Sequence, residues 1–234
     1  MDTVAFNNNV RYLSAVVPDA HHVFEQLRDQ VNWETIIWDR TNRALPRLCA
    51  RSIQETVPGA IVADWVEKFF EQSFHDPKLD STGIRCIVDD VFENRYRNGN
   101  DWLPDHSDQY GEDTHVVSLS FGATRLFRFS QGTVVEPKFY LKEGDMIIFS
   151  PQQNVDYKHG IPKQAQTKEE RINMTIFCRF PGMIEENRGQ GPRGNPYTAV
   201  FKRDCIPPLL APVTTNTETD EELARALQAA EWTD

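Results

Sequence analysis

Residues 94–108, NRYRNGNDWLPDHSD, contain the side chains best suited to bind a metal. His106 and Asp108 are two residues apart, and a strand or an extended turn points both to one side. One imidazole and one carboxylate are two of the three ligands of the 2-His-1-carboxylate triad, which leaves positions open on a non-haem Fe(II). An isolated HxD pair is also a common surface turn, so this interpretation requires a second histidine.

His159 is the candidate for the second histidine. It lies 51 residues after Asp108, in DYKHGIP, just after the strand-like run MIIF at residues 146–149. A ferrous triad needs such a ligand from a distant strand. We therefore expect His106, Asp108 and His159 to meet.

The segment ERINMTIFCRF predicts a strand with two different faces. Arg171, Asn173, Thr175, Phe177 and Arg179 alternate along one face. The other face is wholly apolar and must be core. An arginine in a polar cavity requires a carboxylate, because its planar fork binds one bidentately. A dicarboxylate beside the iron would meet that requirement.

Four motifs together resemble the AlkB-type 2-oxoglutarate- and Fe(II)-dependent dioxygenases. Residues 94–108 are similar to the family's NxYxxGxDxxxxHxD run, and HGIP at His159 resembles its distal-histidine segment. SLSFGATRLFRF at residues 118–129 resembles its SLGxxRxF strand pair, and RINMT at residues 171–175 its RxNxT. The motifs occur in family order over residues 94–180, and the resemblance is closest to members that dealkylate nucleic acid.

The resemblance implies a metal and two co-substrates. His106, Asp108 and His159 would be the catalytic ligands of Fe(II), and 2-oxoglutarate and O₂ would be the co-substrates. A methyl group on a base nitrogen would be hydroxylated and lost as formaldehyde. Alkylated DNA or RNA would then be the substrate.

The resemblance also implies which residues bind 2-oxoglutarate. Arg171 would pair with its distal carboxylate, assisted by Tyr96, while Asn94 and Asn173 would bond the co-substrate or its neighbours. Each has a simpler interpretation. Tyr96 could be a core aromatic, Asn94 a turn residue, and Arg171 a surface residue paired with Glu169 or Glu170.

The chain departs from the family pattern at two positions. RxNxT usually continues to a second arginine, but Phe177 stands there, and Arg179 one pleat further would substitute in part. Repair members often carry an acid two residues after the iron aspartate, where this chain has Tyr110. A tyrosine can stack on a base, but it cannot attract a cationic methylated base as a carboxylate does.

Three residues are expected to contact substrate. Trp102 and Tyr110 flank the HxD pair and are candidate platforms for base stacking, although Trp102 could equally be core. Arg47 follows Pro46 where repair members often have a Pro-Arg pair, in the expected substrate lid.

Composition limits the possible functions. Hydrophobic residues make up 39% of the 234, and no apolar run reaches the length of a membrane span. The net charge of −10 argues against strong non-specific binding to nucleic acid. No signal peptide is visible and the four cysteines lack zinc spacing, so an intracellular location, cytoplasm or nucleus, is expected.

The pattern along the chain predicts an α+β fold. Apolar periodicity predicts amphipathic helices at residues 19–31 and 60–74, followed by short, regularly spaced strands. We expect a double-stranded β-helix (jelly roll) with the N-terminal helices packed on one side. One dioxygenase domain would span residues 1–204, with a lid at about 32–56 and the jelly-roll core at about 82–180.

Residues 205–234 are expected to form a linker and a short helix. Thr219 and Glu222 match a capping box, and LxxALxxA gives an apolar stripe. The acidic residues and this stripe faintly resemble a ubiquitin-interacting helix. A helix docked on its own domain is the alternative.

Three functions remain open from the sequence. The first is oxidative demethylation of nucleic acid, and the second is the same oxygenase chemistry on a protein or small molecule. The third, a non-catalytic scaffold, is disfavoured because all three expected metal ligands are present.

Overall fold

We describe the protein from a computed structural model. It describes residues 3–6, 9–38, 42–51, 57–75, 83–109, 114–135, 137–181 and 200–209. The expected stacking residue Tyr110 and the expected C-terminal helix lie outside these ranges.

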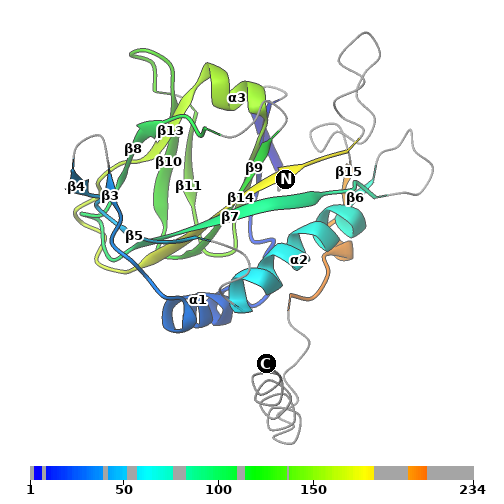
Figure 1. Ribbon diagram of the computed structural model, residues 1–234. Coiled ribbons are helices and arrows are strands. Elements are labelled where there is room, and N and C mark those ends of the chain that lie inside the picture. Colours follow the sequence, from blue (N-terminus) through cyan, green and yellow to red (C-terminus); the bar gives the residue numbers. More distant parts are fainter. Residues whose placement is uncertain are drawn as a thin grey trace, which may run out of the picture.

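Two antiparallel sheets face each other and form the centre of the molecule (Figure 1). The larger has the order β1-β2-β12-β9-β14-β7-β5, and the smaller β11-β10-β13-β8. Neighbours in sequence are seldom neighbours in a sheet, as the expected jelly roll requires. The larger sheet consists of β1 (Thr3–Phe6), β2 (Val10–Leu13), β5 (Leu48–Arg51), β7 (Ile87–Tyr96), β9 (His115–Gly122), β12 (Met146–Phe149) and β14 (Arg171–Arg179). The smaller consists of β8 (Leu103–His106), β10 (Arg125–Ser130), β11 (Lys138–Leu141) and β13 (Lys158–Ile161).

An aromatic-rich core fills the space between the two sheets. Phe127 and Phe129 of β10 pack there with Phe149 of β12 and Phe177 of β14. All four side chains are buried. Because side chains alternate along a strand, every second one points into this core, and the residues between them point to the opposite face of the sheet.

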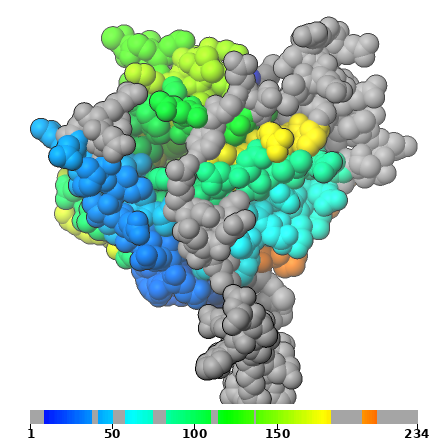
Figure 2. Space-filling view, viewed as in Figure 1, coloured from blue at the N-terminus to red at the C-terminus, as the bar shows by residue number. Residues whose placement is uncertain are grey.

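The second core lies between the larger sheet and two helices. α1 (Ala20–Gln30) and α2 (Val57–Ser73) bury their apolar faces with the outer face of β9 and β14. Both amphipathic helices expected from the sequence are present. In the space-filling view the helices, blue and cyan, lie below β7 (Figure 2). Among the described helices, none has the length and apolar character of a membrane span.

Smaller elements complete the fold. The expected lid region contains a hairpin of β3 (Ile37–Trp38) and β4 (Arg43–Ala44), followed by β5. β6 (Phe74–His75) pairs with β15 (Val200–Phe201), before the 3-10 helix Arg203–Cys205. A short helix, α3 (Pro151–Asp156), was not expected; Ser150 caps it by accepting a hydrogen bond from the Gln153 amide.

The turn before β12 is fixed by a buried carboxylate. Asp145 is 1% exposed and accepts hydrogen bonds from the Tyr12 hydroxyl and from the amides of Ala15 and Lys142. Gly144 takes a φ of 80°, which a residue with a side chain adopts only with strain. The Glu-Gly-Asp sequence thus joins the turn to the end of β2.

We predict that Asp145→Ala lowers the free energy of unfolding by about 2–4 kcal/mol, because three donors lose a charged acceptor that is itself buried. Denaturant unfolding followed by circular dichroism measures the change. Asp156→Ala, at an exposed carboxylate bonded to Gln152, is the control and should change stability little. An equal effect of both substitutions would contradict this account of the turn.

Candidate metal centre and adjoining pocket

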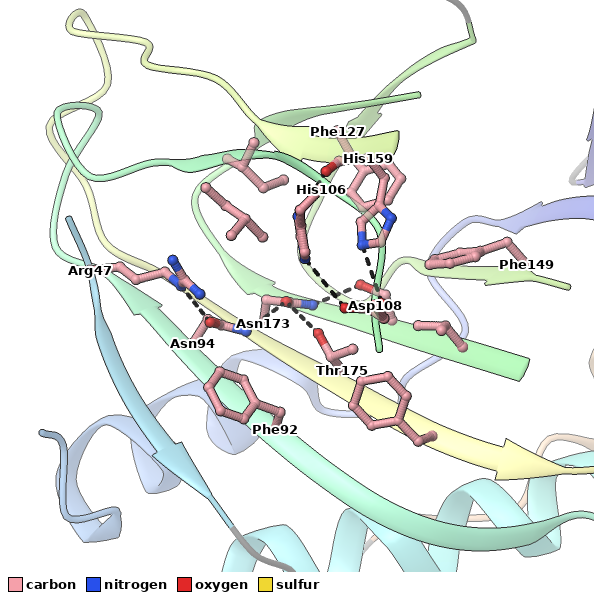
Figure 3. Close-up of a pocket in the computed structure, with 15 residues that line it drawn as sticks. Arg47, Phe92, Asn94, His106, Asp108, Phe127, Phe149, His159, Asn173 and Thr175 are labelled. Atoms are coloured by element: carbon pink, nitrogen blue, oxygen red, sulfur yellow. Dashed lines mark hydrogen bonds and ion pairs between the residues drawn. The ribbon is translucent and has the colours of Figure 1, made fainter. Parts of the chain in front are cut away.

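The pairing of β8 with β13 brings the three expected metal ligands together. His106 is the last residue of β8 and stands opposite His159 of β13 in the antiparallel register. Asp108 follows two residues later and turns back toward both imidazoles (Figure 3). Strand pairing thus closes the 51-residue gap that the sequence leaves open.

Gly160 allows β13 to lie between its neighbours. Arg128 of β10 and Asp105 of β8 form two hydrogen bonds of 3.0 and 3.1 Å across β13, at the level of Gly160. A Cβ on Gly160 would lie 2.5 Å from the Asp105 carboxylate and 2.9 Å from the Leu103 carbonyl oxygen. Only glycine fits beneath this ion pair.

The geometry of the three ligands suits one metal ion. The Nε2 atoms of His106 and His159 each lie 3.3 Å from an oxygen of Asp108. All candidate ligand atoms lie within 4.8 Å of one another. Two imidazole nitrogens and one carboxylate oxygen on one side of a site form the donor set of a facial triad.

The electrostatics keep Asp108 and His159 in their metal-binding forms. Burial acts to raise the pKa of Asp108, but the adjacent imidazoles of His106 and His159 outweigh this effect, and the pKa lies below its usual range. Burial lowers the pKa of His159 below its ordinary value, although Asp108 opposes this shift. A carboxylate beside a neutral imidazole is the state that binds a metal ion without first releasing protons.

Neighbouring groups orient the ligands. The Nδ1 of His106 donates to the backbone oxygens of Pro104 and His159, both at 3.0 Å, so Nε2 keeps its lone pair. The ring of His159 packs against Phe127 and Phe149.

Asn154 of α3 holds the backbone of Asp108. Its Oδ1 accepts from the Asp108 amide, and its Nδ2 donates to the Asp108 carbonyl, both at 2.9 Å. This residue was missed in the sequence analysis. The Ser-Pro start of a short helix before His159 is the signal that could have revealed α3.

A cavity of about 280 Å³ opens beside the three ligands. Its size is close to the lower end for small-molecule sites. One part is apolar, with Phe127, Phe149 and Phe177 among its residues. The polar part consists of Arg47, Asn94, Ser118, Asn173 and Thr175.

The polar side chains form one connected network. Arg47 Nε donates to Asn94 Oδ1 at 2.6 Å, and Asn94 Nδ2 donates to Asn173 Oδ1 at 3.4 Å. Asn173 in turn donates to Ser118 Oγ at 2.7 Å and accepts from Thr175 Oγ1 at 3.1 Å. The two asparagines therefore have fixed orientations on facing positions of β7 and β14.

Two buried guanidiniums retain unused donors. Arg171 is 1% exposed and donates to Ser120 Oγ, but its Nε and Nη1 have no partner. Arg47 Nη1 and the buried Tyr96 hydroxyl also have none. Within the described part of the chain, neither arginine forms an ion pair. Burial lowers the pKa of Arg171 to about 10. Unpaired cationic donors near the cavity fit a ligand that carries carboxylates.

Several residues that the sequence analysis placed at the site have different contacts in the structure. Arg171 is not paired with Glu170, which instead forms an ion pair with Arg95 at 2.9 Å. Arg171 and Tyr96 lie together, with the guanidinium carbon 5.4 Å from the Tyr96 ring centre, and neither lines the cavity itself. Trp102 also lies outside the lining, beside Lys163.

The expectation that Arg179 helps to bind the co-substrate is wrong. Its side chain is 48% exposed and pairs with Asp89 at 2.7 Å, outside the cavity. Arg179 is the last residue of β14, at the exposed end of the strand, where Asp89 binds it. Phe177, in contrast, is buried and lines the cavity.

We predict that His159→Ala abolishes tight binding of one equivalent of divalent metal, because one of three ligands is lost. Anaerobic titration calorimetry with Fe(II) or Mn(II) measures the affinity. His22→Ala, at an exposed helix residue, is the matched control and should bind like the wild type. Unchanged affinity in His159→Ala would place the metal elsewhere.

Asn154→Ala should lower the same affinity by about 10- to 100-fold without loss of the fold, as for other residues that orient a ligand. Gln152→Ala, on the exposed side of the same helix, is the control. An affinity within twofold of the wild type would show that α3 does not position Asp108.

Comparison with known proteins agrees with this geometry. The family model of the 2OG-Fe(II) oxygenase superfamily matches residues 84–176. The chain is 35% identical to the bovine (Bos taurus) alpha-ketoglutarate-dependent dioxygenase alkB homolog 3, over 70% of this chain and 63% of that protein. It is 31% identical to the mouse (Mus musculus) DNA oxidative demethylase ALKBH2, over 39% of this chain and 43% of that protein. The chain thus spans less than two thirds of the length of either relative.

A solved structure supports the fold. A Pseudomonas putida prolyl-4-hydroxylase superposes with a TM-score of 0.51 at 11% identity, over 75% of this chain and 95% of that chain. This likeness shows the jelly-roll architecture alone. The chain is similar to the AlkB-type 2-oxoglutarate- and Fe(II)-dependent oxygenases, and the match to the superfamily model spans the metal ligands.

Proposed function

We propose that this protein is an Fe(II)- and 2-oxoglutarate-dependent dioxygenase that removes alkyl groups oxidatively from bases in nucleic acid. One observation carries the proposal: His106, Asp108 and His159 converge beside a cavity with unpaired buried guanidinium donors. When bound, iron and 2-oxoglutarate activate O₂ and supply the oxidising power, with succinate and CO₂ as products.

Different side chains of the site would bind the iron, bind the co-substrate and exclude water. The two imidazoles and Asp108 would hold the iron on one face and leave the cavity side for 2-oxoglutarate and O₂. Arg171, supported by Tyr96, would place positive charge near the distal carboxylate, while Asn94 and Asn173 would orient the co-substrate. The apolar residues of the cavity, such as Phe127 and Phe177, would exclude water from the reacting carbon.

Support for the substrate class comes from relatives. The mouse relative is named a DNA oxidative demethylase, and hydroxylation of an N-methyl group gives a product that releases formaldehyde. A base in a duplex would have to be flipped out at a cost of a few kcal/mol. Trp102 and Tyr110 are the candidate platforms on which it could stack, which offsets part of that cost.

A second candidate is the same chemistry on a protein or small molecule. The net charge of −10 favours it, because phosphate backbones are attracted by lysine and arginine. The net charge does not argue fully against nucleic acid, because local basic segments, such as residues 39–51 with four arginines, could bind phosphates.

We also propose the domain organisation and location. The catalytic domain would span residues 1–204, with the N-terminal helices as the support of the larger sheet and residues 32–56 as the lid. An intracellular location is proposed because the four cysteines are free thiols. The resemblance of the C-terminal segment to a ubiquitin-interacting helix concerns residues outside the described ranges and carries no proposal.

We predict that the protein with Fe(II), 2-oxoglutarate and a methylated oligonucleotide forms succinate and formaldehyde in equal amounts. His106→Ala should reduce both to background, because the metal loses a ligand. Mass spectrometry of methylated DNA, RNA and peptides, measured in parallel, identifies the substrate. Arg179→Gln, outside the cavity, is the control for general damage.

The outcomes separate the candidates. Turnover of peptide but not of oligonucleotide would favour the second candidate. Failure to form succinate with any substrate, in protein that binds iron, would refute the proposed oxygenase function.

A further inference from the structure

The ion pair between Arg128 and Asp105 joins two strands that are not neighbours in the smaller sheet. Arg128 lies on β10 and Asp105 on β8, and β13 runs between them (Figure 1). Arg128 donates from Nε and Nη2 to the two carboxylate oxygens of Asp105, at 3.0 and 3.1 Å. The Ser130 hydroxyl donates a further hydrogen bond of 3.0 Å to the same carboxylate. Two residues of β10 thus hold one residue of β8.

This link passes over β13 because position 160 has no side chain. Adjacent strands lie about 4.8 Å apart, so β10 and β8 are separated by roughly 10 Å. Gly160 stands opposite Arg128 in the register of β10 and β13. A Cβ at this position would lie 2.5 Å from Oδ1 of Asp105. The glycine therefore leaves the path along which the guanidinium reaches the carboxylate.

Strand β8 has few other constraints on its position. It is the edge strand of the smaller sheet, and β13 is its one neighbour there. The ladder pairs His159 with His106 and Ile161 with Leu103, and its register shifts between these two pairs. Such an irregularity disrupts the backbone hydrogen bonds of a ladder. The hydrogen bonds from β10 act on the residue directly before His106.

The three metal ligands differ in what holds them. His159 lies in a strand paired on both sides, and its side chain is 5% exposed. The backbone of Asp108 is bonded to Asn154. The side chain of His106 is 34% exposed, so packing around the ring constrains it less. The position of this imidazole depends more on where β8 lies.

The Arg128–Asp105 pair has the geometry to fix a strand. Ion pairs on a protein surface usually contribute little to stability. This one is bidentate, and its side chains are only 31% and 22% exposed. A guanidinium fork that binds both oxygens fixes the direction of the carboxylate as well as its distance. The pair can therefore orient β8 even if its contribution to the free energy of folding is small.

We infer that Arg128, acting through Asp105, is a positioning residue that holds His106 where its imidazole binds the metal. The inference rests on the proposed function, because it requires a metal ion at the three ligands. Neither member of the pair lines the cavity. Its loss would therefore act on the metal through β8 and not through a contact with co-substrate or substrate.

The test measures metal binding without turnover. Co(II) is titrated into the metal-free protein under anaerobic conditions, which gives the affinity, and the visible absorption of bound Co(II) reports the number and arrangement of its ligands. We expect Arg128→Gln and Asp105→Asn each to weaken Co(II) binding about 10- to 100-fold, as does the loss of other residues that orient a metal ligand. Both substitutions should also change the Co(II) spectrum.

Two further variants test whether the pair acts as a unit. The double variant Arg128→Gln/Asp105→Asn should bind Co(II) about as well as the weaker single variant, because the same link is lost in each. Arg128→Lys keeps the positive charge but not the planar fork, so it should recover part of the affinity.

The ion pair of Arg95 with Glu170 provides a matched control. It is also bidentate, its side chains are 20% and 30% exposed, and Arg95 lies on β7 of the larger sheet. Arg95→Gln should lower the free energy of unfolding to a similar extent as Arg128→Gln. It should leave the Co(II) affinity and spectrum unchanged, which separates positioning of the ligand from general stability.

A milder substitution decides the question if the Arg128 variants fail to fold. Ser130→Ala removes one hydrogen bond to Asp105 and keeps the ion pair. We expect it to weaken Co(II) binding about two- to fivefold, the effect of one lost hydrogen bond.

Each result supports or overturns the inference. Unchanged Co(II) affinity and spectrum in folded variants of the pair would overturn it and leave the proposed function intact. Additive losses in the double variant, or an equal loss in Arg95→Gln, would also overturn it. A wild type that binds no Co(II) would refute the proposed function and the inference together.

Discussion

The antiparallel pairing of β8 with β13 is the interaction on which the candidate metal centre depends. It sets His106 opposite His159 and leaves Asp108 just beyond the strand end, where its backbone is free to turn back. Gly160 is required there because the Arg128–Asp105 ion pair crosses β13 at that point. The glycine of the HGIP motif therefore serves the packing of the smaller sheet as much as the metal.

Buried positive charge is the second constraint on this interior. Arg47 and Arg171 lie in or beside a space that also holds several phenylalanines, and neither forms an ion pair within the described ranges. A fold that needed only stability would replace such groups by apolar ones. Their retention is understandable if a dianion completes the site, which is the state in which the enzyme would work.

The departures from the family pattern have a structural meaning. Phe177 adds apolar surface to the cavity where a second arginine is usual, and Arg179 cannot take its place because it pairs with Asp89 at the exposed strand end. Arg47, just before the edge strand β5, also lines the cavity.

The sequence by itself determined the local features: the period-two alternation of β14, the amphipathic helices α1 and α2, and the residue types that could bind iron. It could not decide which of them meet, because sheet neighbours in a jelly roll are distant in sequence. Alternation predicted Arg179 on the same face as Arg171, but Arg179 ends β14 and pairs with Asp89 at the exposed strand end, so it lies outside the cavity. Tertiary structure likewise decided the positions of Arg47 and Asn154, since their partners lie more than forty residues away and no local periodicity encodes such contacts.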